Sequence, residues 1–186
     1  MKTPALTLLF LAVSHLPVNA GEVQQAHVDY DDGHYLVKFI MKIEAEVDTV
    51  YAILTDFNNL DKLNKSIKHS QRLKSEGKHH LVRIEAKGCV WLFCQEIIQT
   101  QRVTEQGRGY ISAVTLPEQS NLAYGRVLWH IQQHDEFTII SYHTDIVPAF
   151  FVPPLIGPYF MKTRLLEKAG ETIQNIERLA QEEENY

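Results

Sequence analysis

An amphipathic pattern in the last long segment constrains this chain more than any other feature. Six apolar residues recur there at spacings of three or four, which places them on one face of a helix: Met161, Leu165, Ala169, Ile173, Ile176 and Ala180. A proline-rich stretch, 150–158, leads into this helix and is interpreted as a hinge. A single helix can bury such a stripe only against another element. The rest of the chain must therefore supply a surface for it.

The segment before the hinge is typical of an antiparallel sheet. Between residues 35 and 45 the odd positions are apolar and the even ones are mostly charged, which predicts a strand with one buried face. Residues 23–30 are a candidate for a short edge strand. Turn residues separate six further predicted strands, at 67–75, 80–87, 91–104, 109–116, 124–134 and 137–147.

Two short helices are expected after the first main strand. One covers 49–54 with Asp48 as its N-cap, and the other lies within 56–64. Strands and helices are thus segregated, which predicts an α+β fold. We expect one curved antiparallel sheet of about seven strands, wrapped around the long C-terminal helix.

The first twenty residues have the composition of a signal peptide. Lys2 precedes an apolar run at 5–13, and Val18-Asn19-Ala20 is a small-x-small cleavage signal. The run is shorter than the roughly 20 apolar residues that a membrane-spanning helix needs. We therefore expect cleavage after Ala20, a single domain at 21–186, and a periplasmic or secreted protein. A retained N-terminal anchor is the alternative.

Charge and cysteine content narrow the partners. The chain has 18 basic and 23 acidic residues, and loss of Lys2 with the leader leaves 17 against 23. This acidic balance, without a basic cluster, argues against nucleic acid as a partner. The only two cysteines, Cys89 and Cys94, are expected to form one disulfide in an exported protein. Two thiols without nearby histidines are too few ligands for a metal, so no metal site is predicted.

The order of these elements, the segment Ala-Ile-Leu-Thr-Asp-Phe-Asn-Asn-Leu at 52–60 and the proline-rich entry to the last helix together resemble a known family. It is the START-like or SRPBCC helix-grip superfamily, which includes polyketide cyclase/dehydrase, lipid-transport and coenzyme Q-binding proteins. The resemblance implies a hydrophobic cavity between sheet and helix, but neither the ligand nor the chemistry. Export and the cysteine pair both depart from the familiar members.

Side-chain alternation predicts which residues line such a cavity. The odd-numbered residues of strands 91–104 and 124–134 should face the helix. Together with apolar residues of the short helices, the hinge and the long helix, they give the expected lining: Phe57, Leu60, Phe93, Ile97, Val127, Trp129, Phe150, Phe151, Ile156, Phe160 and Leu165. A tightly packed core without room for a ligand is the alternative.

No catalytic residue or cofactor is predicted. Ser141, His143 and Asp145 alternate on one strand, so their side chains project in parallel about 7 Å apart instead of converging. The leading hypothesis is a protein that binds or carries a hydrophobic small molecule or lipid. A cyclase/dehydrase-type enzyme and an interaction module without a cavity are the alternatives. The aromatic hairpin 88–94 is interpreted either as a lip that makes transient membrane contact or as core, and no oligomeric state is predicted.

Overall fold

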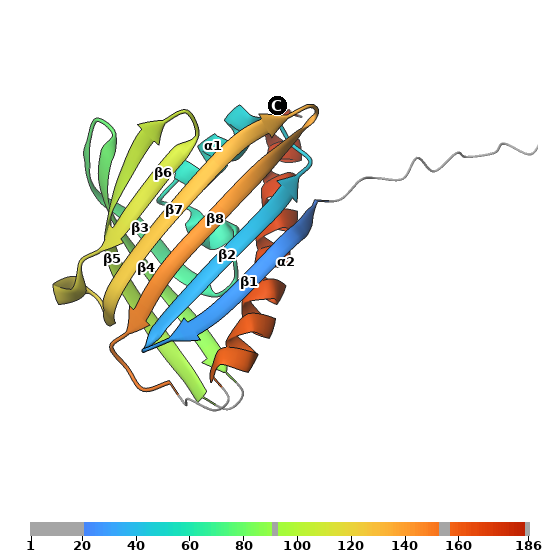
Figure 1. Ribbon diagram of the computed structural model, residues 1–186. Helices are drawn as coiled ribbons and strands as arrows, with labels where there is room; N and C mark the ends of the chain where they lie inside the picture. The colour runs from blue at the N-terminus through green and yellow to red at the C-terminus, as the bar shows by residue number, and fades with distance from the viewer. Residues whose placement is uncertain (1–20, 91–92, 153–156, 185–186) are drawn as a thin grey trace, which may run out of the picture.

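The computed structural model describes residues 21–90, 93–152 and 157–184 (Figure 1). The chain forms a strand hairpin, a helical connection, six further strands and a long helix. The elements are β1 (Glu22–Asp31), β2 (His34–Ile43), α1 (Val47–Thr55), the 3-10 turn η1 (Leu60–Lys62), β3 (Ile67–Glu76), β4 (His79–Val90), β5 (Phe93–Gly107), β6 (Tyr110–Thr115), the 3-10 turn η2 (Pro117–Gln119), β7 (Leu122–His134), β8 (Phe137–Pro148) and α2 (Gly157–Glu184).

The strands form one antiparallel sheet in the order β1-β2-β8-β7-β6-β5-β4-β3, so β1 and β3 are its edges. In Figure 1 the long helix α2 lies behind the sheet, on the side of β1 and β2. The predicted α+β architecture, a curved sheet with a long C-terminal helix, is confirmed. The sheet has eight strands instead of about seven, because residues 22–31 form a full strand paired along β2. Asp32 and Gly33, both with positive φ, make the turn between these two strands.

The helical connection differs from the prediction in two details. Helix α1 begins at Val47 after Glu46, and Asp48 lies within its first turn without capping it. An acidic side chain there still interacts favourably with the helix dipole. The second predicted helix, 56–64, contains only the short turn η1. Its three apolar residues, Phe57, Leu60 and Leu63, are spaced by three, which suits a 3-10 turn as well as an α-helix.

Strand register divides the sheet into an inner face toward the helices and an outer face. The odd-numbered residues of β2 are buried on the inner face, whereas Leu36 and Lys38 are exposed on the outer one. The inner residues of neighbouring strands join them in one core with α1 and the C-terminal part of α2: Met41, Ile43, Val50, Ile53, Val82, Val103, Ile111, Ile131, Ile140, Ile173 and Ile176. The sheet thus presents one continuous apolar surface to α2.

The predicted disulfide is confirmed. Cys89 and Cys94 are cross-strand partners of β4 and β5, with Cα atoms 4.0 Å apart. The hinge prolines Pro153 and Pro154 lie outside the described residues. Pro158 falls in the first turn of α2, where its missing N–H leaves no helical bond unmade. Within the described parts of the chain, no helix is long and apolar enough to cross a membrane.

Candidate functional site: the inner face of the sheet under α2

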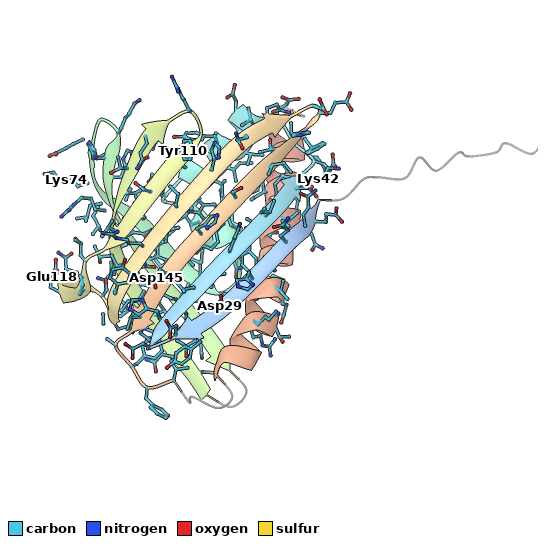
Figure 2. All side chains as sticks on the ribbon, in the orientation of Figure 1. Asp29, Lys42, Lys74, Tyr110, Glu118 and Asp145 are labelled. Carbon is cyan, nitrogen blue, oxygen red and sulfur yellow. A yellow bond between two sulfur atoms is a disulfide. The ribbon has the colours of Figure 1, made fainter. Side chains whose placement is uncertain are left out.

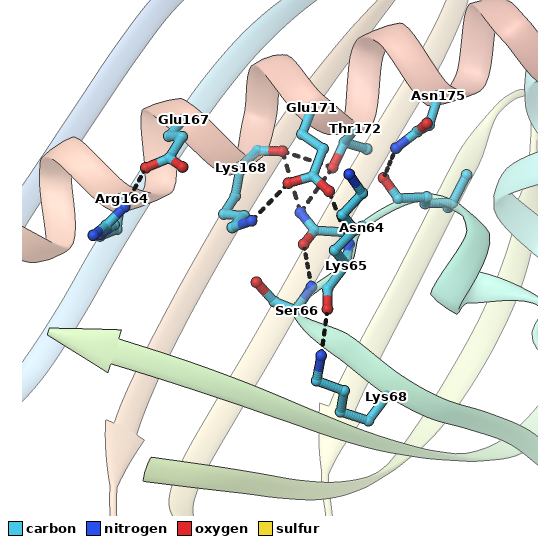
Figure 3. A network of polar contacts seen from close by, with 11 residues as sticks. Asn64, Lys65, Ser66, Lys68, Arg164, Glu167, Lys168, Glu171, Thr172 and Asn175 are labelled. Atoms are coloured by element: carbon cyan, nitrogen blue, oxygen red, sulfur yellow. Dashed lines mark hydrogen bonds and ion pairs between the residues drawn. The ribbon is translucent and has the colours of Figure 1, made fainter. Parts of the chain in front are cut away.

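Helix α2 is attached to both edges of the open sheet. At the β1 edge, Ile173 and Ile176 are 1% exposed and join the core, and the Glu177 carboxylate accepts a hydrogen bond from the backbone N–H of Glu44 at 2.8 Å. At the other edge, the segment 63–66 before β3 holds the helix (Figure 3). The helix therefore bridges the two edges and covers the inner face between them.

The second attachment, which we call the α2 clasp, consists of Asn64, Lys65, Glu171 and Asn175. The Asn64 amide donates to the Lys168 carbonyl and the Thr172 hydroxyl, both at 3.2 Å, and the Asn175 amide donates to the Leu63 carbonyl at 3.1 Å. Glu171 accepts from the Lys65 backbone N–H at 3.0 Å (Figure 3). The hydrogen bond from the Lys168 ammonium, followed by that backbone N–H, lowers the pKa of the Glu171 carboxyl.

Packing under α2 is closed at one end and looser at the other. Ala169, Ile173, Ile176 and Ala180 of the predicted stripe are buried, whereas Leu165, nearer the start of the helix, is only half-buried. The side chain of Met161, the first member of the stripe, lies outside the described residues. Among the described side chains of the stripe, burial therefore decreases toward the start of α2.

The inner face of the sheet shows the same gradient. Ile43, Ile131 and Ile140 are fully buried, but Val127 and Trp129 on the same face are half-buried. Trp129 packs on the half-buried Tyr142, whose ring centroid lies 4.4 Å from that of Trp129 and 6.2 Å from that of Phe39.

The hydroxyl of Tyr142 lies in a desolvated part of the inner face. Desolvation by the surrounding protein raises the pKa of the Tyr142 hydroxyl, yet the side chain keeps accessible surface. The Tyr142 ring is therefore desolvated without being fully covered by other residues. We call the half-buried group Val127, Trp129, Tyr142 and Leu165 the aromatic patch.

The structure separates the residues expected to line a cavity. Val127, Trp129 and Leu165 belong to the aromatic patch, and Ile97 is half-buried on the inner face of β5. Phe57 is 6% exposed and packs on His80 beside α1. Leu60 and Phe150 are half-buried, whereas Phe151 is 79% exposed. Ile156 lies outside the described residues. The side chains of Phe93 and Phe160 are also outside the described set.

A polar chain that the sequence analysis missed lies at the α1 end of the inner face. The Tyr51 hydroxyl donates to one oxygen of Glu105 at 2.5 Å, and the other oxygen is 2.8 Å from Nε2 of His80. Nδ1 of His80 is 2.9 Å from the Ser75 hydroxyl. Burial and the bond to Glu105 raise the pKa of Tyr51. The sequence does contain a signal for this chain. His80 lies two residues before Val82 and Glu105 two residues after Val103, so strand alternation places both on the inner face.

This Ser75–His80–Glu105–Tyr51 chain links β3, β4, β5 and α1. A hydroxyl, an imidazole and a carboxylate in line can move a proton. His80 is 6% exposed under Phe57, however, so the chain first of all fixes α1 to the sheet.

The outer face of the sheet has a groove of its own, of about 470 Å³. Its apolar members Leu36, Val114 and Leu128 are about 40% exposed, and Lys38 and Arg126 flank them. Asp145, labelled on this face in Figure 2, pairs with His34 at 2.7 Å. Ser141 and His143 lie on the same outer face and do not converge with Asp145. Among the described residues, no group of three or more histidines, cysteines and carboxylates is placed to hold a metal.

Comparison with known proteins gives matches in structure only. No protein-family model matches the sequence, and no curated protein does. The aromatase/cyclase ZhuI of Streptomyces sp. R1128 superposes with a TM-score of 0.64 at 15% identity, over 80% of this chain and 94% of its own. The STAR-related lipid transfer protein of Xanthomonas axonopodis gives 0.58 at 13% identity, over 84% and 98%. Human STARD10 gives 0.60 at 10% identity, over 87% and 76%.

The chain has the START-like helix-grip fold. The match extends over most of this chain and of each of these structures, so it includes the sheet and α2 together. At these identities it establishes the helix-grip fold and leaves the ligand to be argued from the residues.

Proposed function

We propose that this helix-grip protein is exported and carries a hydrophobic small molecule or lipid between the sheet and the N-terminal half of α2. The half-buried aromatic patch carries the proposal, because its side chains keep accessible surface on a face where Ile43, Ile131 and Ile140 are fully buried. Each 100 Å² of apolar surface that a ligand covers there supplies roughly 2.5 kcal/mol before the costs of association. The phenol of Tyr142 and the amide of Gln99, which bonds to Thr115 at 2.8 Å, offer polar anchors for a head group.

The neighbours in structure support this class of ligand. Two of them are described as lipid transfer and aromatase/cyclase proteins, and these names point to apolar or aromatic ligands. The leader sequence and the disulfide support an oxidising, exported setting.

The direct test is native mass spectrometry, with lipid extraction, of protein purified from the export compartment. We expect a co-purifying hydrophobic ligand. Its absence, together with no stabilisation by a panel of fatty acids, phospholipids and isoprenoid alcohols, would reject the carrier function.

Two adjacent variants locate the site. Val127→Phe adds a ring to the aromatic patch, and Leu128→Phe adds the same ring to the outer groove. We expect Val127→Phe to abolish binding and Leu128→Phe to leave it unchanged. The opposite result would place the ligand in the outer groove. In a Trp91→Phe background, the fluorescence of Trp129 reports binding of each panel member directly.

The Ser75–His80–Glu105 chain favours one second candidate, acid–base chemistry on a bound substrate. His80→Gln tests it, since the variant keeps a hydrogen-bonding side chain but loses the imidazole. Loss of turnover of a bound ligand with unchanged ligand affinity would support an enzyme. A ligand recovered chemically unchanged after incubation with the wild-type protein would exclude it.

A further inference from the structure

Glu177 is a buried carboxylate with no positively charged partner among the described residues. It lies in the C-terminal half of α2 and is 9% exposed. One oxygen accepts the N–H of Glu44, and no ion pair among the described residues includes Glu177. The nearby Lys42 ammonium pairs instead with Glu44 at 2.5 Å and lies over the ring of Phe137 at 4.4 Å. A buried carboxylate without a cationic partner is costly, and a cation beside it would offset that cost.

Gly21 packs directly against this carboxylate. A Cβ atom built on Gly21 would lie 2.3 Å from Oε1 of Glu177, 2.5 Å from the Lys42 carbonyl oxygen and 2.7 Å from Cγ2 of Ile173. No side chain fits there. The backbone nitrogen of a residue lies about 2.5 Å from its Cβ position, so the Gly21 nitrogen is within about 4.8 Å of Oε1.

Gly21 is also the residue that leader cleavage would expose. Hydrolysis of the Ala20–Gly21 amide by a signal peptidase consumes one water. It leaves a carboxylate on Ala20 and an amine on Gly21, which takes up a proton and becomes an ammonium. The small-x-small signal at 18–20 and the glycine that α2 requires at 21 are independent observations, and they meet at the same bond.

We propose that the α-ammonium of Gly21, released by cleavage after Ala20, is the cationic partner of the Glu177 carboxylate and completes the junction between β1 and α2. The inference rests on the proposed export but not on the ligand. Before cleavage the Gly21 nitrogen is an uncharged amide, and the carboxylate stays unpaired. Processing of the leader therefore strengthens the attachment of α2, the helix that covers the aromatic patch.

A two-by-two comparison of purified proteins tests the pairing. Four proteins are compared: chains that begin at Gly21 or at Ala20, each with either Glu177 or Glu177→Gln. The extra Ala20 moves the α-ammonium charge one residue away from Gly21. Glu177→Gln removes the carboxylate charge but keeps the size of the side chain. We expect the extension to raise the unfolding equilibrium constant about tenfold with Glu177 and to have little effect with Glu177→Gln. Additive effects would overturn the pairing.

Glu171→Gln is the matched control, because Glu171 lies on the same helix in the α2 clasp. Its effect should add to that of the extension. A second readout holds even if Glu177→Gln folds poorly. NMR titration of the Gly21 amine in the wild-type protein should give a pKa above the usual 7.7–8.0 for an α-amino group. The described contacts place the charged residues Glu22, Lys42, Glu44 and Glu177 at this junction, so the Gly21 amine is also titrated in a Glu44→Gln variant. An ordinary amine pKa would contradict the pairing.

Intact-mass analysis of the exported protein separates the two proposals. A chain that begins at Gly21 but shows no coupling with Glu177 would overturn this inference and leave export standing. A chain that begins at any other residue would overturn both the cleavage site and the pairing. Ligand recovery from the same sample tests the carrier function independently of either result.

Discussion

Glu171 is the residue through which the α2 clasp responds to pH. Hydrogen bonds from Lys168 and from the Lys65 backbone hold the pKa of its carboxyl below the ordinary value of 4.5. A carboxyl with a lowered pKa in the folded state stabilises the fold above about pH 4.5, and that contribution is lost as the pH falls further, because the unfolded chain takes up the proton first. We therefore predict that Glu171→Gln weakens the dependence of stability on pH between 5 and 3.

The measurement is urea unfolding at a series of pH values. Glu167→Gln is the control, since Glu167 pairs with Arg164 on the exposed side of the same helix at 2.6 Å, with both side chains more than half exposed. Identical pH profiles for wild type and Glu171→Gln would show that the clasp carboxylate contributes nothing to acid stability.

At the scale of elements, α2 should differ in energy along its length. Ile176 is fully packed at the closed end, so Ile176→Ala should lower the free energy of unfolding by about 2–5 kcal/mol. Leu165→Ala removes a half-buried side chain of the aromatic patch and should lower the free energy of unfolding by about 1 kcal/mol. Equal losses in chemical denaturation would mean that the N-terminal half of α2 is packed as tightly as the rest.

The β4–β5 hairpin is the second element with a measurable constraint. The Cys89–Cys94 bond closes a loop of only a few residues, for which chain entropy predicts a stabilisation of about 2 kcal/mol. Reduction should lower the denaturation midpoint of the wild-type protein and leave a Cys89→Ser, Cys94→Ser variant unchanged. If reductant shifts both proteins equally, the effect does not come from this bond.

The whole molecule depends on α2 bridging the two edges of the sheet. Because the helix packs on β1 at one edge and is held by 63–66 at the other, we predict that the core amides of α2 and β1 exchange with solvent at one common free energy of opening. Native-state hydrogen exchange measures this amide by amide. Fast exchange of the β1 amides while α2 stays protected would show that the edges open independently.

Alternation along single strands makes most of the fold predictable. The pattern at 35–45 and the parity of 124–134 are enough to place Val127 and Trp129 on the inner face, where they lie. The failures are local. Asp48 is a suitable cap by residue type, but the helix starts one residue before it. The backbone N–H of Val47 donates to the side chain of Gln133, which is distant in the sequence, and Glu46 at the N-cap position makes no capping bond. Residues 22–31 look marginal as a strand because edge strands show weaker burial than central ones.

The sequence by itself determined the order of strands and helices, the amphipathic stripe of α2, the cysteine pair and the faces of the strands, because each depends on periodicity or spacing within a short segment. Only the tertiary structure decided which partners met across the chain. The Ser75–His80–Glu105–Tyr51 chain and the α2 clasp join residues up to 112 positions apart. The contact of Gly21 with Glu177 brings together residues near the two ends of the domain. Such contacts follow from strand register and the angle of α2, to which distant segments contribute jointly.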